Sequence, residues 1–288
     1  MNSIEILKNE FQTASFNFDQ RIKKIISSKM NDGTVFPPYI PFIGKNYDKY
    51  KVLSYATAQN INPVYQLFLQ KKSLEKQANY LKLSERLLEF NETYPEKPIS
   101  YRNIAINPYR CGILPALLGV FLYAKFGKKI INLDELNDYI AVTNYYKFSL
   151  NNGKDIHPEK KLPQIIGNKT LVENFWDIND KLVEKELEVL SPEYIIVFNG
   201  RKVTKLREMI NSQCKIIKIN DPSWILQGGG GKLKKGKGWG VIVEEYKNSE
   251  ISELITEYLK GLDGNYKGRD ENSFVYLLHY YHEWKIVL

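Results

Sequence analysis

The stretch Tyr194-Ile-Ile-Val-Phe-Asn-Gly200 is the clearest strand signal in the chain. β-Branched and aromatic residues run without a polar interruption and then meet Asn-Gly, a pair typical of turns. The segment 202–210 that follows has the spacing of a helix. A continuous apolar strand followed by a helix is typical of a buried parallel sheet, so this stretch predicts an α/β fold.

Three further segments fit the same sheet, at 51–57, 139–143 and 215–219. Each is a short β-prone run, and polar residues follow it. The carboxyl ends of parallel strands meet at one edge of a sheet, which is where ligands of such sheets bind. We therefore expect Asn60, Asn144 and Asp221 to converge on one rim.

Helical patterns separate these strands, at about 64–91, at 112–126 with a start near Pro115, and at 170–190. We predict a three-layer α/β/α fold around a central, mostly parallel, four-stranded sheet. The whole chain, 1–288, is expected to form a single domain. It would comprise a helical N-terminal extension at 1–40, a core at 41–245 with a helical insertion at about 64–110, and C-terminal helices at 246–288.

The composition favours a polyanionic partner. The 288 residues include 41 Lys and Arg against 33 Asp and Glu, which gives a formal charge of +8, and such a field attracts nucleic acid. Cys111 and Cys214 are too few for a disulfide framework or an iron–sulfur cluster. The sequence has no apolar run as long as a membrane span and no secretory leader pattern. We expect a soluble, cytoplasmic protein with no membrane partner.

A glycine- and lysine-rich loop lies at 228–239. It carries Lys232, Lys234, Lys235 and Lys237 among six glycines, and it lacks the Lys-Ser/Thr ending of a Walker A loop. Glycine lets backbone N–H groups approach phosphates, and lysine supplies positive charge. The loop is therefore predicted to clamp a DNA backbone, although a merely flexible, solvated loop has the same composition.

Four segments, in this order, resemble the motifs of the uracil-DNA glycosylase superfamily: 52–62, 140–147, 194–206 and 217–226. The resemblance spans about residues 40–245. It implies an enzyme that flips a base out of DNA and hydrolyses its N-glycosidic bond, with no metal, iron–sulfur cluster or other cofactor.

The first two motifs of the resemblance supply its central residues. Ala58-Gln59-Asn60 is similar to the family's Gly-Gln-Asp, which implies that Gln59 contacts the base and that Asn60 orients water. Asn144 matches the family residue that reads the edge of the flipped base, since an amide offers both a donor and an acceptor. Both asparagines are also ordinary residues for a turn or a helix cap.

The last motif departs from the family, because Asp221-Pro222-Ser223 stands where many relatives have His-Pro-Ser. An aspartate anion would repel the charge that grows on a departing base. Asp221 would then play another role or act on another base, or it simply begins a turn. Residues Ser223, Trp224, Ile225 and Leu226 stand where relatives contact DNA and insert an apolar wedge, although Trp224 also suits a core.

A flipped base needs a flat partner. Tyr109, in a Pro-Tyr-Arg segment, is the predicted stacking residue, and Tyr145 competes for this role. The histidines His157, His279 and His282 form no metal-ligand spacing, and the last two lie in a Tyr-rich tail that looks structural.

These features together predict a monomeric, monofunctional DNA glycosylase. Its substrate would be single- or double-stranded DNA carrying a modified or damaged pyrimidine, with uracil equally compatible. Its role would be in DNA repair or in defence against phage with modified bases. A catalytically inactive DNA-binding module of the same fold would also explain the two departures from the family, Asn60 in place of its Asp and Asp221 in place of its His. An unrelated α/β enzyme acting on nucleosides or nucleotides is a third interpretation.

Overall fold

A computed structural model describes residues 3, 6–7, 35–36, 41–56, 113–147, 149–150, 163–164, 166–198, 202–210, 212–219, 239–261 and 270–288. The chain forms two compact units. The first comprises Met1–Arg102 and Ile140–Lys218, and the second comprises Asn103–Tyr139 and Ile219–Leu288.

The central sheet has five strands in the order β2-β4-β3-β6-β7. Their bounds are β2 Phe42–Ile43, β3 Val52–Ala56, β4 Ile140–Asn144, β6 Tyr194–Phe198 and β7 Lys215–Ile219. Strand β3 pairs in parallel with both β4 and β6, whereas β2 runs antiparallel to β4. A separate antiparallel pair joins β1, Val35–Phe36, to β5, Ser149–Leu150.

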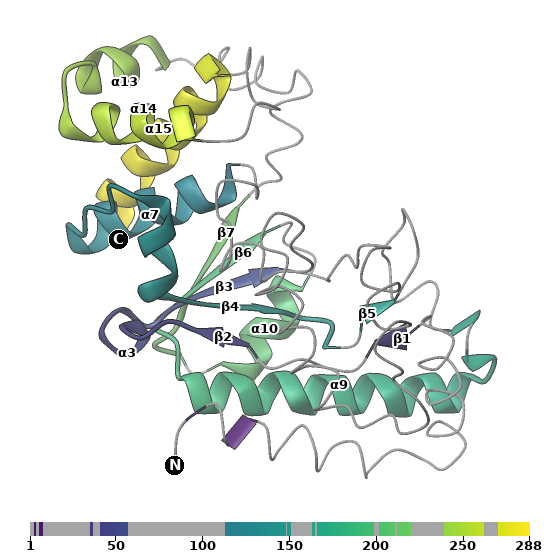
Figure 1. Cartoon of the computed structure of the whole chain (residues 1–288). Helices are drawn as coiled ribbons and strands as arrows, with labels where there is room; N and C mark the ends of the chain where they lie inside the picture. Colours follow the sequence, from purple (N-terminus) through teal and green to yellow (C-terminus); the bar gives the residue numbers. More distant parts are fainter. Residues whose placement is uncertain are drawn as a thin grey trace, which may run out of the picture. The chain divides into compact units, whose positions relative to one another are not determined.

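The sheet confirms the predicted α/β class and all four predicted strands, but it corrects the strand number. The fifth strand, β2, is only two residues long, so it is too short to show the alternation that identifies a strand in sequence. The sheet is therefore mixed and mostly parallel, and helices flank it (Figure 1).

Helix α9, Lys169–Leu190, is the long helix of the first unit. It begins at Asn168, whose side chain accepts a hydrogen bond from the Leu171 backbone N–H at 3.1 Å, an ordinary N-cap. It ends at Ser191, which adopts a left-handed conformation with φ of 42° immediately before Pro192. Two shorter helices of this unit are α3 Tyr47–Tyr50 and α10 Val203–Met209.

The core of the first unit lies between α9 and one face of the sheet. Alternation along the strands directs Leu53 and Tyr55 of β3 to this face. On the helix, the apolar positions recur every three to four residues, and Phe175 and Leu182 are examples. Figure 1 shows α9 running alongside the sheet, so its apolar stripe covers the strands and removes both surfaces from water.

The described elements that lie wholly within the second unit are helices. They are α7 Leu114–Phe126, the 3₁₀ helix η2 Leu133–Asp138, α13 Trp239–Tyr246, α14 Glu250–Gly261 and α15 Asp270–Val287. Helix α7 is apolar on nearly all sides and packs against α15 and α14. Its Phe121 ring meets the Trp284 ring of α15 edge-on, with centroids 5.2 Å apart. Pro115 near its start and left-handed Gly127 after its end set its limits.

The two C-terminal histidines lie on α15. The His279 ring is 3.1 Å from Glu283 one turn away, and the His282 ring is 3.2 Å from the Tyr246 hydroxyl of α13. Both have helix-surface contacts within their own unit, as their Tyr-rich surroundings indicated. None of the helices in the described ranges is long and apolar enough to cross a membrane.

Candidate functional site

The strand order places a topological switch point beside β3. The chain passes from β3 to β4 on one side and later to β6 on the other, and all three strands are parallel. Crevices outside the carboxyl ends of strands at such a point are the usual ligand sites of open α/β sheets. The rim formed by the ends of β3, β4 and β6 is therefore the candidate site.

Asn144 is the predicted site residue that the structure places on this rim. It is the last residue of β4 and lies opposite Ala56, the last residue of β3, in the parallel register. Its side chain is buried, with 2% of the residue exposed. The structure thus places Asn144 at the end of β4, while the predicted convergence with Asn60 and Asp221 stays a prediction, because both lie outside the described residues.

Tyr145 follows Asn144 and is equally buried. Its hydroxyl donates a hydrogen bond to Asp180 of α9 at 2.7 Å. Its ring meets Tyr146 edge-on at 5.4 Å, and the Lys202 ammonium lies 5.1 Å from its centre. These contacts make the ring part of the core between α9 and the sheet, and a stacking role for Tyr145 stays a prediction.

The remaining predicted site residues lie outside the described part of the chain. They are Gln59, Asn60, Tyr109, Asp221, Ser223, Trp224, Ile225, Leu226, Lys232, Lys234, Lys235 and Lys237. Their roles in catalysis, base binding and DNA contact stay predictions.

A buried ion pair lies just behind the rim. Lys147 Nζ is 2.5 Å from Glu186 Oε1, and their side chains are 2% and 0% exposed. Lys147 belongs to the segment that follows β4, whereas Glu186 belongs to α9. The pair therefore joins the end of a strand to the helix that covers it.

Two hydroxyl groups complete the surroundings of Glu186. Thr143 donates to Glu186 Oε2 at 3.0 Å and accepts from Lys147 Nζ at 2.9 Å. Tyr55 donates to Glu186 Oε1 at 3.4 Å, and its ring centre lies 5.4 Å from the Lys147 ammonium. Tyr55 and Thr143 are register partners on β3 and β4, so both carboxylate oxygens are bonded to neighbouring strand ends.

Burial acts against both charges of the pair. Desolvation raises the pKa of Glu186 and lowers the pKa of Lys147, while their mutual attraction and hydrogen bonds oppose these shifts. Burial and the Glu186 charge also raise the pKa of Tyr55, so this phenol remains a donor at neutral pH. A buried charge is tolerated only when it is paired and hydrogen-bonded. Here Lys147, Thr143 and Tyr55 all donate hydrogen bonds to the Glu186 carboxylate.

Sequence reasoning missed Glu186, Lys147 and Asn179, although a signal existed. In α9 the buried positions include Ile178, Leu182 and Leu187, and Asn179 and Glu186 fall on the same stripe. Polar residues at positions that helical periodicity assigns to the core are expected to have a buried partner. The helical pattern therefore indicates that Asn179 and Glu186 are buried polar residues with partners, but it does not identify the strand end that they contact.

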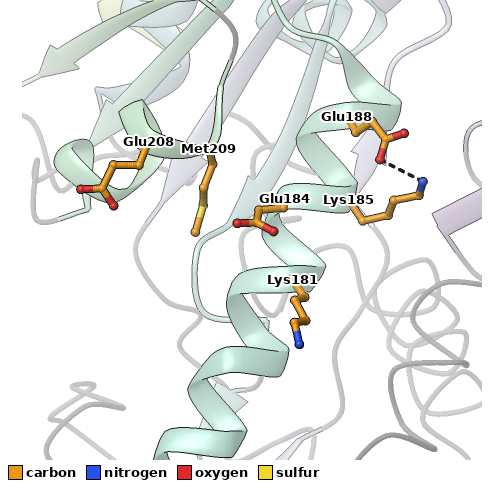
Figure 2. Close-up of a pocket in the computed structure, with 6 residues that line it drawn as sticks. All are labelled: Lys181, Glu184, Lys185, Glu188, Glu208 and Met209. Carbon is orange, nitrogen blue, oxygen red and sulfur yellow. Dashed lines mark hydrogen bonds and ion pairs between the residues drawn. The ribbon is translucent and has the colours of Figure 1, made fainter.

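An open pocket with a volume of about 530 Å³ lies between α9 and α10, and Figure 2 shows the side chains that line it. It is lined by Lys181, Glu184, Lys185, Glu188, Glu208 and Met209. Glu184 extends from α9 toward Met209, while Lys185 and Glu188 form an ion pair at 2.9 Å. Three carboxylates against two ammonium groups give this lining a net negative charge, which does not suit a DNA backbone.

Among the residues that the structure describes, no group of three or more His, Cys, Asp and Glu side chains is placed to hold a metal ion. The comparisons with known proteins give no further guide to chemistry. No protein-family model, no curated protein and no solved structure matches the chain.

Proposed function

We propose that this protein is a DNA glycosylase that flips a modified or damaged pyrimidine out of DNA and hydrolyses its N-glycosidic bond. The observation that supports this most is the position of Asn144 at the end of β4, in register with the end of β3. The chain leaves β3 only four positions before Asn60. An amide that reads a base and a residue that orients water must approach the same nucleotide, and one rim would serve both.

The proposed chemistry divides between these two asparagines. The Asn144 amide would donate to and accept from the edge of the flipped base, which fixes its identity and orientation. Asn60 would orient a water molecule toward the sugar carbon as the base departs. An amide accepts a proton poorly, so this hydrolysis is expected to be slower than one assisted by a carboxylate. Positive charge on the sugar would be stabilised by the neighbouring phosphates.

The backbone clamp of the proposed enzyme is the lysine-rich loop. Lys232, Lys234, Lys235 and Lys237 would neutralise phosphates on either side of the flipped nucleotide. The wedge residues Trp224, Ile225 and Leu226 would fill the space that the nucleotide leaves in the stack. DNA is the partner, and the formal charge of +8 supports this choice.

The test is an abasic-site assay. Oligonucleotides carrying uracil, mismatched thymine or modified cytosines are incubated with the protein, and abasic sites are then cleaved with alkali. Cleavage of one substrate by the wild type, abolished in Asn60→Ala and Asn144→Ala, supports the proposal. Asn174→Ala is the matched control, because Asn174 Oδ1 accepts no hydrogen bond within the described part of the chain.

A second candidate is a DNA-binding module without catalysis. Asp221 favours it, since an anion at that position opposes the departure of a negatively charged base. Salt-sensitive DNA binding without abasic sites on any substrate would establish this candidate and reject the glycosylase.

A further inference from the structure

One amide on α9 holds the backbone that follows Asn144. Asn179 Oδ1 accepts a hydrogen bond from the Lys147 backbone N–H at 2.8 Å, and Asn179 Nδ2 donates to the Tyr145 backbone carbonyl at 3.3 Å. The two bonds lie on either side of residue 146. The side chain therefore fixes the direction in which the chain leaves β4.

Asn179 occupies a position that a core would ordinarily give to an apolar residue. It is completely buried, and its helix neighbours Ile178 and Leu182 are buried in the apolar core. Burying an amide is unfavourable unless its hydrogen bonds are made. Both of its hydrogen bonds to backbone atoms go to one short segment, so the burial of Asn179 is matched specifically to residues 145–147.

Neighbouring side chains of α9 hold the same segment at two more points. Asp180 accepts from the Tyr145 hydroxyl at 2.7 Å, and Glu186 pairs with the Lys147 ammonium at 2.5 Å. Asp180 also pairs with Lys205 of α10 at 3.1 Å. Backbone and side chains of the segment are thus anchored separately, and Asn179 supplies the backbone anchors.

We propose that Asn179 is a positioning residue for Asn144. By fixing the backbone of residues 145–147, it holds the Asn144 amide where the proposed enzyme reads the base; the inference therefore rests on the proposed function. Asn179 itself touches no substrate. Catalytic geometry must be held to about 0.5 Å, and a misplacement of about 1 Å can reduce a rate about 100-fold.

The test compares Asn179→Ala with Asn174→Ala, an identical substitution five residues earlier on the same helix. Single-turnover excision is measured at saturating protein, on the oligonucleotide that the wild type cleaves. DNA affinity is measured by fluorescence anisotropy at a temperature where circular dichroism shows both variants folded. For Asn179→Ala we expect excision about 100-fold slower, with the Kd for DNA within about twofold of the wild-type value, because phosphate contacts dominate affinity. Asn174→Ala should change neither quantity.

Asn179→Leu keeps the test decisive if Asn179→Ala does not fold. Leucine is close to asparagine in size and adds no charge to the core, but it lacks both the acceptor for the Lys147 N–H and the donor for the Tyr145 carbonyl, so excision about 100-fold slower is again expected. Equal excision rates in the position-179 and position-174 variants would overturn the inference and leave the enzyme proposal intact. Parallel loss of DNA affinity and rate would show general loosening and overturn it as well. A wild type that forms no abasic sites would overturn the proposed function and this inference together.

Discussion

Replacing both Lys147 and Glu186 with apolar residues is expected to cost less stability than replacing either one alone. The perturbation is the set Lys147→Met, Glu186→Leu and the double variant. The two side chains are almost completely buried and lie 2.5 Å apart. Removal of one member leaves the other charge uncompensated in the core, which ordinarily costs about 3–5 kcal/mol.

The double variant has no buried charge left, but it retains two hydroxyl groups that have lost an acceptor. Thr143 and Tyr55 both donate to Glu186. A buried donor without its acceptor costs about 1–3 kcal/mol, and Thr143 can rotate toward another acceptor. New apolar contacts offset part of this cost. We therefore expect the double variant to lose about 2 kcal/mol, against about 4 kcal/mol for each single variant.

The assay must report on the first unit alone, because the chain forms two units. Trp176 lies on α9, with its ring centre 5.3 Å from that of Tyr146. In protein labelled with 5-fluorotryptophan, its fluorine signal during a urea titration follows unfolding of this unit, and Trp176→Phe assigns the signal. If the free-energy changes of the two single variants simply add in the double variant, the two charges do not stabilise each other and the argument is refuted.

Three further outcomes follow from particular contacts. First, because the pKa of Glu186 is raised above 4.5 by burial, the folded state binds its proton more readily than the unfolded state. As the pH rises from about 4.5 through the folded pKa, the free energy of unfolding of the wild type should therefore fall relative to that of the Lys147→Met/Glu186→Leu double variant. Urea titrations across this pH range measure both free energies, and a difference between them that does not change with pH would contradict this expectation. Second, Gly119→Ala should destabilise the second unit by about 1–3 kcal/mol, since a Cβ there would lie 2.7 Å from the Tyr258 hydroxyl oxygen; an unchanged thermal transition of that unit would refute this. Third, burial raises the pKa of Cys214 to about 11. With the other cysteine replaced by serine, its alkylation rate should keep rising through pH 10, whereas a plateau near pH 9 would show an ordinary thiol.

The strands and longer helices could be predicted from the sequence because their signals are local. The run 194–198 and the segment 215–219 have the exact bounds of β6 and β7. Strand β2 could not be found, because two residues carry no period and its place depends on pairing with β4. The order of the strands is likewise a property of long-range pairing, which propensity does not encode.

In the candidate site, too, local features could be predicted from the sequence and long-range contacts could not. Asn144 could be placed at a strand end, because a polar residue terminates an apolar run. Its support from α9 could not be placed, since Asn179 and Lys147 are 32 positions apart and meet only when the helix packs on the sheet. Sequence periodicity identifies Asn179 as a polar residue on a buried stripe, and tertiary structure alone supplies its partner.

The distribution of buried polar groups is the strongest structural argument for a site at this rim. An efficient core for α9 would use apolar residues at positions 179 and 186, because buried amides and charges contribute little net stability. Instead, both side chains and the Lys147 ammonium are buried, and their hydrogen bonds to other elements lead to residues 143–147 or to Tyr55. Polar residues that break a core pattern are expected where a structure has to hold a functional geometry. Here they surround the end of β4 and leave the middle of the strand apolar. The first unit therefore rigidifies the one place in its described sheet where the switch point and a predicted base-reading residue coincide.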